Sequence, residues 1–195
     1  MLDVLHRYSN LRDFEEESVA QEFEEALQQV RAKILEEAAQ DPALAGMGTT
    51  LTMAFTSDWK LFVVHAGDSR CSLFRSGEIQ QLTTDHTVVA ELIRRGSLRP
   101  EDAAHHLYRH VVTNAVGGNS PQLLVEIRKL DLQAQDVLLL CSDGLTDMLS
   151  KERIVAVLQA ESDPQRACEC LLAEANNEGG RDNITAIVAR FMPSG

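Results

Sequence analysis

The sequence predicts an α+β fold in which helices pack on antiparallel β-sheets. Three observations lead to this prediction: a long amphipathic stretch near the start, a series of short β-rich runs in the middle, and two helical segments before a final apolar strand. The chain has 195 residues, the length of about one domain. Its 44% hydrophobic and 25% charged residues are typical of a globular domain and exclude a disordered chain.

Residues 13–39 are expected to form one amphipathic helix. Its apolar residues recur about every 3.6 positions, which places them on one face. These residues are Val19, Phe23, Leu27, Val30, Ile34 and Leu35. Asp13 is a candidate N-cap with Glu16 three positions later, and the Asp41-Pro42 pair is expected to end the helix.

Short β-rich runs dominate the next part of the chain. They cover residues 50–55, 61–66, 71–75 and 78–82. Turn residues separate them, and Ser76-Gly77 joins the last two. Consecutive runs of this kind predict an antiparallel meander. A helix is then expected from Thr87 to Arg95, with Gly96 just after its last turn.

Two further strands are expected in the second half of the chain before the last one. Residues 97–120 form an irregular polar stretch, whereas residues 124–132 alternate in polarity as a strand does. The continuous apolar run 137–141 predicts a strand that is buried on both faces. Residues 183–191 predict the final strand, also apolar on both faces.

Two helices are expected between the last two strands. Ser150 is a good N-cap for the first, which should run to about residue 159. Asp163-Pro164 should start the second helix, because proline is favoured at the first helical position, and Gly179-Gly180 should end it.

Charge and composition exclude several kinds of partner. The formal net charge of −12 makes nucleic acid an unsuitable partner, since an acidic surface repels phosphate. The sequence has no signal-peptide pattern and no apolar run of about 20 residues, so a cytoplasmic protein with no membrane contact is expected. The four cysteines are expected to be reduced and packed. Most histidines are expected at the surface, namely His65, His86, His105, His106 and His110.

Three carboxylates stand at expected strand ends beside glycine. Asp68 follows Gly67 between two strands, Asp143 directly follows the most apolar strand, and Asp182 precedes the last strand. Carboxylates held in this way suit hard divalent cations, which take oxygen ligands. The alternative is that each aspartate simply forms a turn. Spacing alone does not decide whether the three meet in space.

Six short motifs in the chain resemble, in order and spacing, those of the PPM-type (2C class) metal-dependent protein serine/threonine phosphatases. They are Gly46–Leu51, Val64–Arg70, Leu82–Thr87, Asn114–Gly118, Leu139–Asp147 and Gly180–Thr185. The resemblance runs from about residue 46 to residue 191. Any one of these motifs is a weak signal, but six in the same order are highly specific.

The resemblance implies two stacked antiparallel sheets flanked by helices, an α-β-β-α sandwich. It implies a single domain over residues 1–195, with residues 87–120 as a flap that contributes to substrate choice. It also implies two Mn²⁺ or Mg²⁺ ions, and a third that binds more weakly. Asp143 and Asp182 would be metal ligands, and Asp68 would help to hold the third ion. Asn183 and Gly144 would support these ligands.

The implied activity is hydrolysis of phosphoserine and phosphothreonine in a phosphorylated protein, opposing a serine/threonine kinase. The nucleophile would be a water that the metal ions activate, so no side chain is expected to act as the catalytic group. Family members begin with two strands that carry a phosphate-binding Arg and an Asp-Gly motif whose Asp bridges the ions. No segment of this chain matches them, so the fold is expected to be incomplete at its N-terminus and the activity of this chain reduced.

Three explanations of this difference stay open: a start codon upstream, a domain fragment, or a non-catalytic descendant. In the last case the chain would be a pseudophosphatase or a module that binds phosphoproteins without turnover. A regulator of the SpoIIE-like branch is a weaker alternative, because Thr83–His86 and Gly67–Arg70 favour the serine/threonine phosphatase branch.

Overall fold

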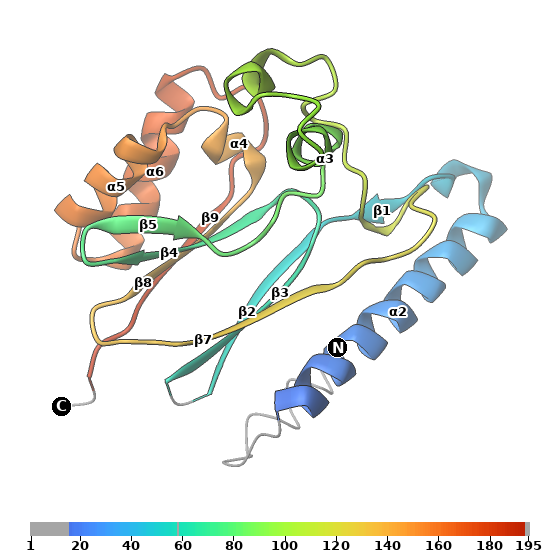
Figure 1. Ribbon diagram of the computed structural model, residues 1–195, viewed down its shortest axis with the longest axis horizontal. Helices are drawn as coiled ribbons and strands as arrows, with labels where there is room; N and C mark the ends of the chain where they lie inside the picture. Colours follow the sequence, from blue (N-terminus) through green and yellow to red (C-terminus); the bar gives the residue numbers. More distant parts are fainter. Residues whose placement is uncertain (1–15, 58, 194–195) are drawn as a thin grey trace. The chain divides into compact units, whose positions relative to one another are not determined.

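The structure is a computed structural model that describes residues 16–57 and 59–193 (Figure 1). The chain divides into two compact units. The first contains residues up to 51 together with 64–67 and 85–127, and the second contains residues 52–63, 68–84 and 128 onward. Within the described residues, no helix is both long enough and apolar enough to cross a lipid bilayer.

The first unit is built around one long helix and a pair of very short strands. Its elements are α2 (Glu16–Gln40), η1 (Pro42–Leu44), β1 (Gly48–Thr49), α3 (Val88–Arg94), η2 (Pro100–His105) and β6 (Val116–Gly117). Strand β1 pairs antiparallel with β6. The side chains of Gln28 and Arg31 on α2 donate hydrogen bonds to the carbonyls of Leu123 and Ser120, at 3.1 and 2.9 Å.

The expected boundaries of this unit agree with the structure where it can be compared. The first helix ends at Gln40, and the proposed N-cap Asp13 lies outside the described residues. Thr87 caps α3, since its hydroxyl accepts from the Ala90 N–H at 3.2 Å, and Gly96 follows with a φ of 70°. The stretch 97–120 is less irregular than expected, because it contains η2 and β6.

Two sheets contain the remaining strands. The three-stranded sheet has the order β2-β3-β7, and the four-stranded sheet has the order β5-β4-β8-β9. The strands are β2 (Leu51–Ser57), β3 (Lys60–Ala66), β4 (Arg70–Arg75), β5 (Glu78–Gln81), β7 (Glu126–Asp131), β8 (Val137–Cys141) and β9 (Ala186–Arg190). The expected meander is interrupted: β2 neighbours β3 and β4 pairs with β5, but the consecutive strands β3 and β4 belong to different sheets.

The four-stranded sheet of the second unit is covered on both faces. On one face, Cys71 and Leu73 of β4 and Leu138 of β8 pack with Leu61 and Val63 of β3. On the other face lie α4 (Asp143–Thr146), α5 (Lys151–Ala160) and α6 (Pro164–Asn177), as Figure 1 shows. This confirms the expected α+β fold of stacked antiparallel sheets flanked by helices.

Most local predictions for the second unit are confirmed. Ser150 and Asp163 cap α5 and α6, accepting hydrogen bonds from the N–H groups of Arg153 and Arg166. The last strand, β9, was expected to be apolar on both faces and therefore covered. It instead forms the edge of the four-stranded sheet, where Ile187 is 57% exposed.

The cysteines are all free, and two of them are buried as expected. Burial raises the pKa of the Cys71 thiol to about 12, and the neighbouring Cys141 adds to this effect. A thiol with so high a pKa is a poor nucleophile at neutral pH, because the thiolate is the reactive form. Cys71 therefore acts as a packed side chain between the sheets.

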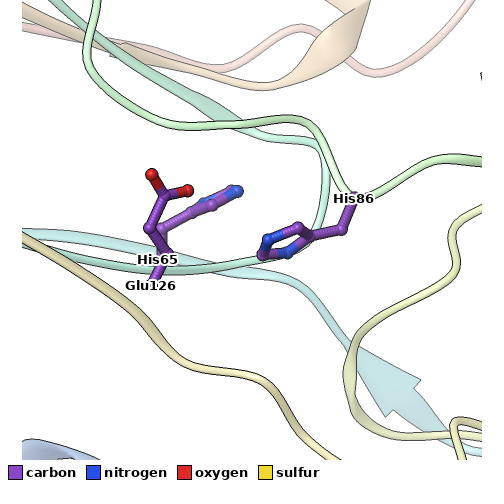
Figure 2. A group of neighbouring side chains, drawn as sticks. All are labelled: His65, His86 and Glu126. Atoms are coloured by element: carbon purple, nitrogen blue, oxygen red, sulfur yellow. The ribbon is translucent and has the colours of Figure 1, made fainter. Parts of the chain in front are cut away.

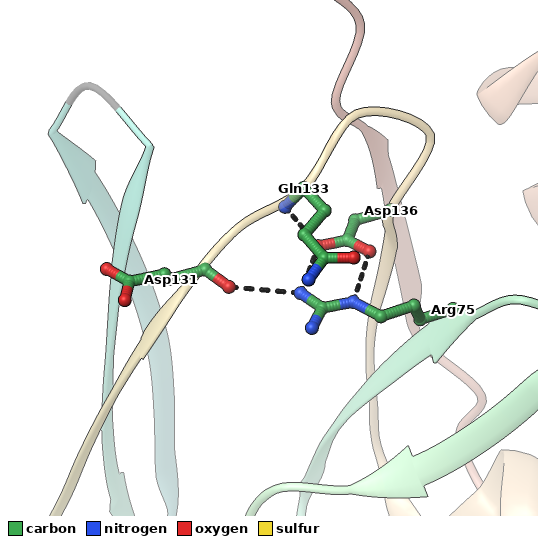
Figure 3. A network of polar contacts seen from close by, with 4 residues as sticks. All are labelled: Arg75, Asp131, Gln133 and Asp136. Atoms are coloured by element: carbon green, nitrogen blue, oxygen red, sulfur yellow. Dashed lines mark hydrogen bonds and ion pairs between the residues drawn. The ribbon is translucent and has the colours of Figure 1, made fainter.

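An ion pair with a buried carboxylate lies at one end of the four-stranded sheet (Figure 3). Asp136 is 1% exposed, and its two carboxylate oxygens accept from Nε and Nη2 of Arg75 at 2.7 and 2.6 Å. The Gln133 N–H donates to the same carboxylate at 2.7 Å, and Arg75 also donates to the carbonyl of Asp131 at 3.0 Å. Burial alone raises the pKa of Asp136, but these hydrogen bonds outweigh it and lower the pKa.

Candidate metal centre

The three aspartates singled out in the sequence flank one end of the four-stranded sheet. In the register of the sheet, Arg70 of β4 pairs with Cys141 of β8, and Cys141 pairs with Ala186 of β9. Asp68 lies just before β4, Asp143 just after β8, and Asp182 shortly before β9. Neighbouring strands lie about 4.8 Å apart, so the chain segments of Asp68 and Asp182 flank that of Asp143 on either side.

Ser142 joins the segments that carry Asp143 and Asp182. Its hydroxyl donates to the carbonyl of Asn183 and accepts from the N–H of Thr185, each at 3.1 Å. Its own N–H donates to the carbonyl of Thr185 at 3.1 Å. Sequence reasoning assigned no role to Ser142. The signal that could have found it is a hydroxyl residue between the buried strand and Asp143.

Gly144 lets these two segments approach each other closely. A Cβ atom at this position would lie 2.5 Å from the carbonyl oxygen of Asn183 and 3.2 Å from its carbonyl carbon. The φ angle of Gly144 is not in the left-handed region, so space and not backbone conformation demands glycine here. The expected supporting position of Gly144 therefore has a steric basis.

Hydrogen bonds hold the Asp182 side chain and the backbone beside Asp68. Asp182 is exposed, and its Oδ1 accepts from the N–H of Asn183 at 2.7 Å. Asp68 is half-buried, and the hydroxyl of Thr52 donates to the carbonyl of the adjacent Ser69 at 3.0 Å. Asp143 is half-buried at the first residue of α4. All three carboxylates thus stand on backbone that the sheet holds in place.

The donor chemistry of this end of the sheet fits hard divalent cations. Three carboxylates offer oxygen ligands only, which is the ligand type of Mg²⁺ and related ions. The three do not form a group in which one oxygen of each lies within 4.8 Å of the others. As the side chains stand, one ion would not contact all three carboxylates.

The family model described as protein phosphatase 2C matches residues 1–177 of the chain. The chain belongs to the protein phosphatase 2C family.

Solved and curated members of the protein phosphatase 2C family resemble the chain closely. Protein phosphatase PhpP of Streptococcus pneumoniae is 40% identical over 146 residues, which are 75% of this chain and 59% of PhpP. The S. agalactiae serine/threonine phosphatase structure is 31% identical and superposes with a TM-score of 0.87, covering 98% of this chain and 78% of that one.

A third relative was solved with metal. The catalytic domain of the phosphatase PstP, whose structure is in complex with two manganese ions, is 34% identical with a TM-score of 0.74. That match covers 83% of this chain and 66% of the PstP chain. The chain spans about 59% of the length of PhpP.

A second polar cluster of this 2C-family chain lies in its first unit (Figure 2). His65, His86 and Glu126 each offer a ligand atom within 4.8 Å of the others. The two imidazole rings stack with centroids 4.9 Å apart. His65 is fully buried and His86 half-buried, so their expected surface position is wrong. His65 is buried because every residue of β3 after Lys60 is buried.

The hydrogen bonds of His86 explain why this cluster is structural. Its Nδ1 accepts from the N–H of Gly67 at 3.0 Å and lies 2.9 Å from Nδ2 of Asn114. Asn114 is itself fixed, since its amide exchanges hydrogen bonds with the backbone of Leu124. The proton of neutral His86 therefore sits on Nε2, which leaves no lone pair there for a metal. The cluster holds Gly67 in place.

Proposed function

We propose that the chain is the metal-binding part of a serine/threonine protein phosphatase, with Asp143 and Asp182 as metal ligands. The observation that carries the proposal is the pairing of β4, β8 and β9, which gathers three carboxylates at one end of a sheet. Membership of the protein phosphatase 2C family supports it. The activity of the whole protein belongs to the proposal, since the chain spans 59% of PhpP.

The ions are Mn²⁺ or Mg²⁺, and the PstP complex with two manganese ions supports manganese. When bound, they supply a water of lowered pKa and positive charge that offsets the charge of the phosphoryl oxygens. Asp143 and Asp182 would hold the ions, and Ser142 and Gly144 keep the two chain segments that carry them close together. Without a cation, the three carboxylates repel a phosphate, so substrate binding depends on prior metal binding.

Asp68 has a lesser role in this proposal. The three carboxylates do not lie within 4.8 Å of one another, so Asp68 would hold a further ion rather than one shared by all three. Its replacement should leave the tighter ions in place and change turnover only.

The substrate class is a protein that carries phosphoserine or phosphothreonine, and the biological counterpart is a serine/threonine kinase. The names of the relatives support this class, since PhpP is a protein phosphatase and PstP a serine/threonine phosphatase. Residues 87–120 are proposed to act as a flap that contributes to substrate choice within a single phosphatase domain.

The test is hydrolysis of p-nitrophenyl phosphate and of a phosphothreonine peptide with Mn²⁺, together with calorimetric Mn²⁺ binding. Asp143→Asn and Asp182→Asn should lower both binding and turnover at least about tenfold, because an amide keeps the volume but removes the charge. Asp131→Asn is the control, since it removes the same charge from an exposed residue beside Arg75, which lies at the end of β4 away from Asp68.

Two results would contradict the proposal. Equal Mn²⁺ binding by wild type and Asp143→Asn would show that the ligands lie elsewhere. Tight binding of Mn²⁺ and of the phosphopeptide without turnover would instead identify a phosphoprotein-binding module.

A further inference from the structure

A pocket of about 370 Å³, whose lining includes Ile79, Leu149 and Ile154 as well as polar residues, lies in the second unit beside the candidate metal centre. It lies between β4, β5 and the helices α4 and α5. Its polar lining consists of Arg70, Ser72, Gln81, Thr146, Ser150 and Lys151. None of these residues is among the metal ligands proposed above, and the proposed function does not use the pocket.

The side chains on one face of β4 change from apolar to polar toward the metal centre, and the pocket lies beside the polar part. Arg70, Ser72 and Phe74 alternate along β4 and so share a face. Phe74 packs in the core under the helices, whereas Ser72 and Arg70 are only half-buried. Gln81 of β5 pairs with Ser72, which places a second polar side chain beside it. The apolar core therefore ends before the sheet does.

The charged residues that line the pocket are positive, whereas the chain as a whole is negative. Arg70 and Lys151 line it, and among the residues that the structure describes no acidic one lines it, although the formal net charge of the chain is −12. A lining that contains an arginine and a lysine suits an anion, and the planar guanidinium of arginine suits a phosphate in particular. The Ser72 hydroxyl can donate a further hydrogen bond.

The pocket lies within reach of a substrate bound at the metal centre. Arg70 is the first residue of β4 and only two residues from Asp68, so their Cα atoms lie at most about 7 Å apart. Thr146 is three residues from Asp143 along a helix, a rise of about 4.5 Å. An extended peptide advances about 3.3 Å per residue. A group one to three residues from the reacting phosphoryl group can therefore enter the pocket.

We propose that this pocket binds a second anionic group of the substrate phosphoprotein, best a second phosphate, within about three residues of the phosphate that is hydrolysed. The inference rests on the proposed phosphatase function and adds a preference for doubly phosphorylated segments. An acidic side chain shares the anionic chemistry but offers fewer oxygens and less charge, so it should be bound more weakly.

The first test compares KM values with Mn²⁺ for peptides that share one phosphothreonine. A second phosphoserine, a glutamate or an alanine is placed two residues before or after it. Relative to alanine, the second phosphate should lower KM about tenfold in at least one of the two positions, and glutamate only about two- to threefold. Lys151→Gln should reduce the phosphate preference to about threefold or less.

The control for this variant is Lys33→Gln, which removes the same charge from the exposed face of α2 and should keep the full preference. Lys151 is preferred to Arg70 for the test, because Arg70 lies close to Asp68. Equal KM values for the phosphate and alanine peptides in both positions would overturn the proposal. A preference that Lys151→Gln and Lys33→Gln affect equally would also overturn it.

A second measurement does not depend on turnover. Inorganic phosphate is titrated into the protein loaded with diamagnetic Mg²⁺, and backbone amide shifts are followed by NMR. Shifts should gather at Ser72, Thr146 and Lys151, disappear in Lys151→Gln and persist in Lys33→Gln. Phosphate shifts elsewhere only, or none, would overturn the pocket as an anion site.

The two measurements separate this inference from the function on which it rests. Turnover of every peptide with equal KM would leave the phosphatase function intact and refute the pocket's role. Shifts at the pocket without hydrolysis of any peptide would refute the phosphatase function and, with it, the pocket's role in substrate choice.

Discussion

Replacement of Gly144 by alanine tests the geometry that holds Asp143 near Asp182. The added Cβ would lie 2.5 Å from the carbonyl oxygen of Asn183, whereas ordinary contact begins at 3.4 Å. The two segments must therefore move apart by up to 0.9 Å. Overpacking of this kind lowers the free energy of unfolding by about 1–3 kcal/mol. The better helix propensity of alanine raises it by about 1 kcal/mol. The net loss of unfolding free energy should be about 0–2 kcal/mol.

The effect on metal binding should be much larger than this loss of stability suggests. Two ligands of one site that separate by most of an ångström no longer fit the narrow distance range of an ion such as Mg²⁺. Calorimetry with Mn²⁺ should show at least about a tenfold loss of affinity, which corresponds to about 1.4 kcal/mol. Circular dichroism should show an unchanged fold.

Gly96→Ala is the matched control. Gly96 has a φ of 70° and no atom within 4 Å of an added Cβ, so alanine strains the backbone there but meets no neighbour. It should cost about 1–2 kcal/mol of stability and leave Mn²⁺ affinity unchanged. Wild-type Mn²⁺ affinity in Gly144→Ala would refute the reasoning, as would equal losses of affinity in the two variants.

Three further predictions address other contacts. Ser142→Ala should lose about 1–2 kcal/mol in urea unfolding and weaken Mn²⁺ binding, whereas Ser142→Thr, which keeps the hydroxyl, should retain both. Asp136→Asn should lower the unfolding free energy by about 2 kcal/mol. Breaking a fully buried ion pair costs about 3–5 kcal/mol, and the smaller effect is expected here because Arg75 is 32% exposed. An unchanged urea midpoint would contradict this prediction. Burial, aided by His65, lowers the pKa of His86 below 6.5, so stability should fall as pH drops below about 6.5, and His86→Gln should lessen that slope in thermal unfolding.

Local sequence signals predicted the helix boundaries well. Ser150 and Asp163 act as N-caps, and Gly96 follows α3, because each effect depends on a few neighbouring residues. The apolar run Val137–Cys141 forms a buried strand. This could be predicted because five consecutive apolar residues place apolar side chains on both faces of a strand.

Features that depend on distant residues could not be predicted in this way. The separation of β3 and β4 into two sheets depends on which strands pair, and local patterning does not contain this information. The exposure of Ile187 follows from the edge position of β9. His65 appeared to be a surface residue because its burial depends on the surrounding sheet.

The candidate site likewise combines features that local sequence signals predict with features that depend on distant residues. Asp68, Asp143 and Asp182 stand out locally as carboxylates at strand ends, and the family resemblance assigned them ligand roles, which stay predictions. The contacts of Ser142 and Gly144 with Asn183 join segments about 40 residues apart in the sequence. No local pattern contains such a contact, so these two residues gain their roles only from the structure.

The most direct test of the central claim is anomalous diffraction at the manganese edge from crystals grown with Mn²⁺. The account predicts anomalous peaks within about 2.5 Å of carboxylate oxygens of Asp143 and Asp182. Peaks only at other residues, with both of these carboxylates unliganded in a protein that hydrolyses phosphopeptides, would contradict it.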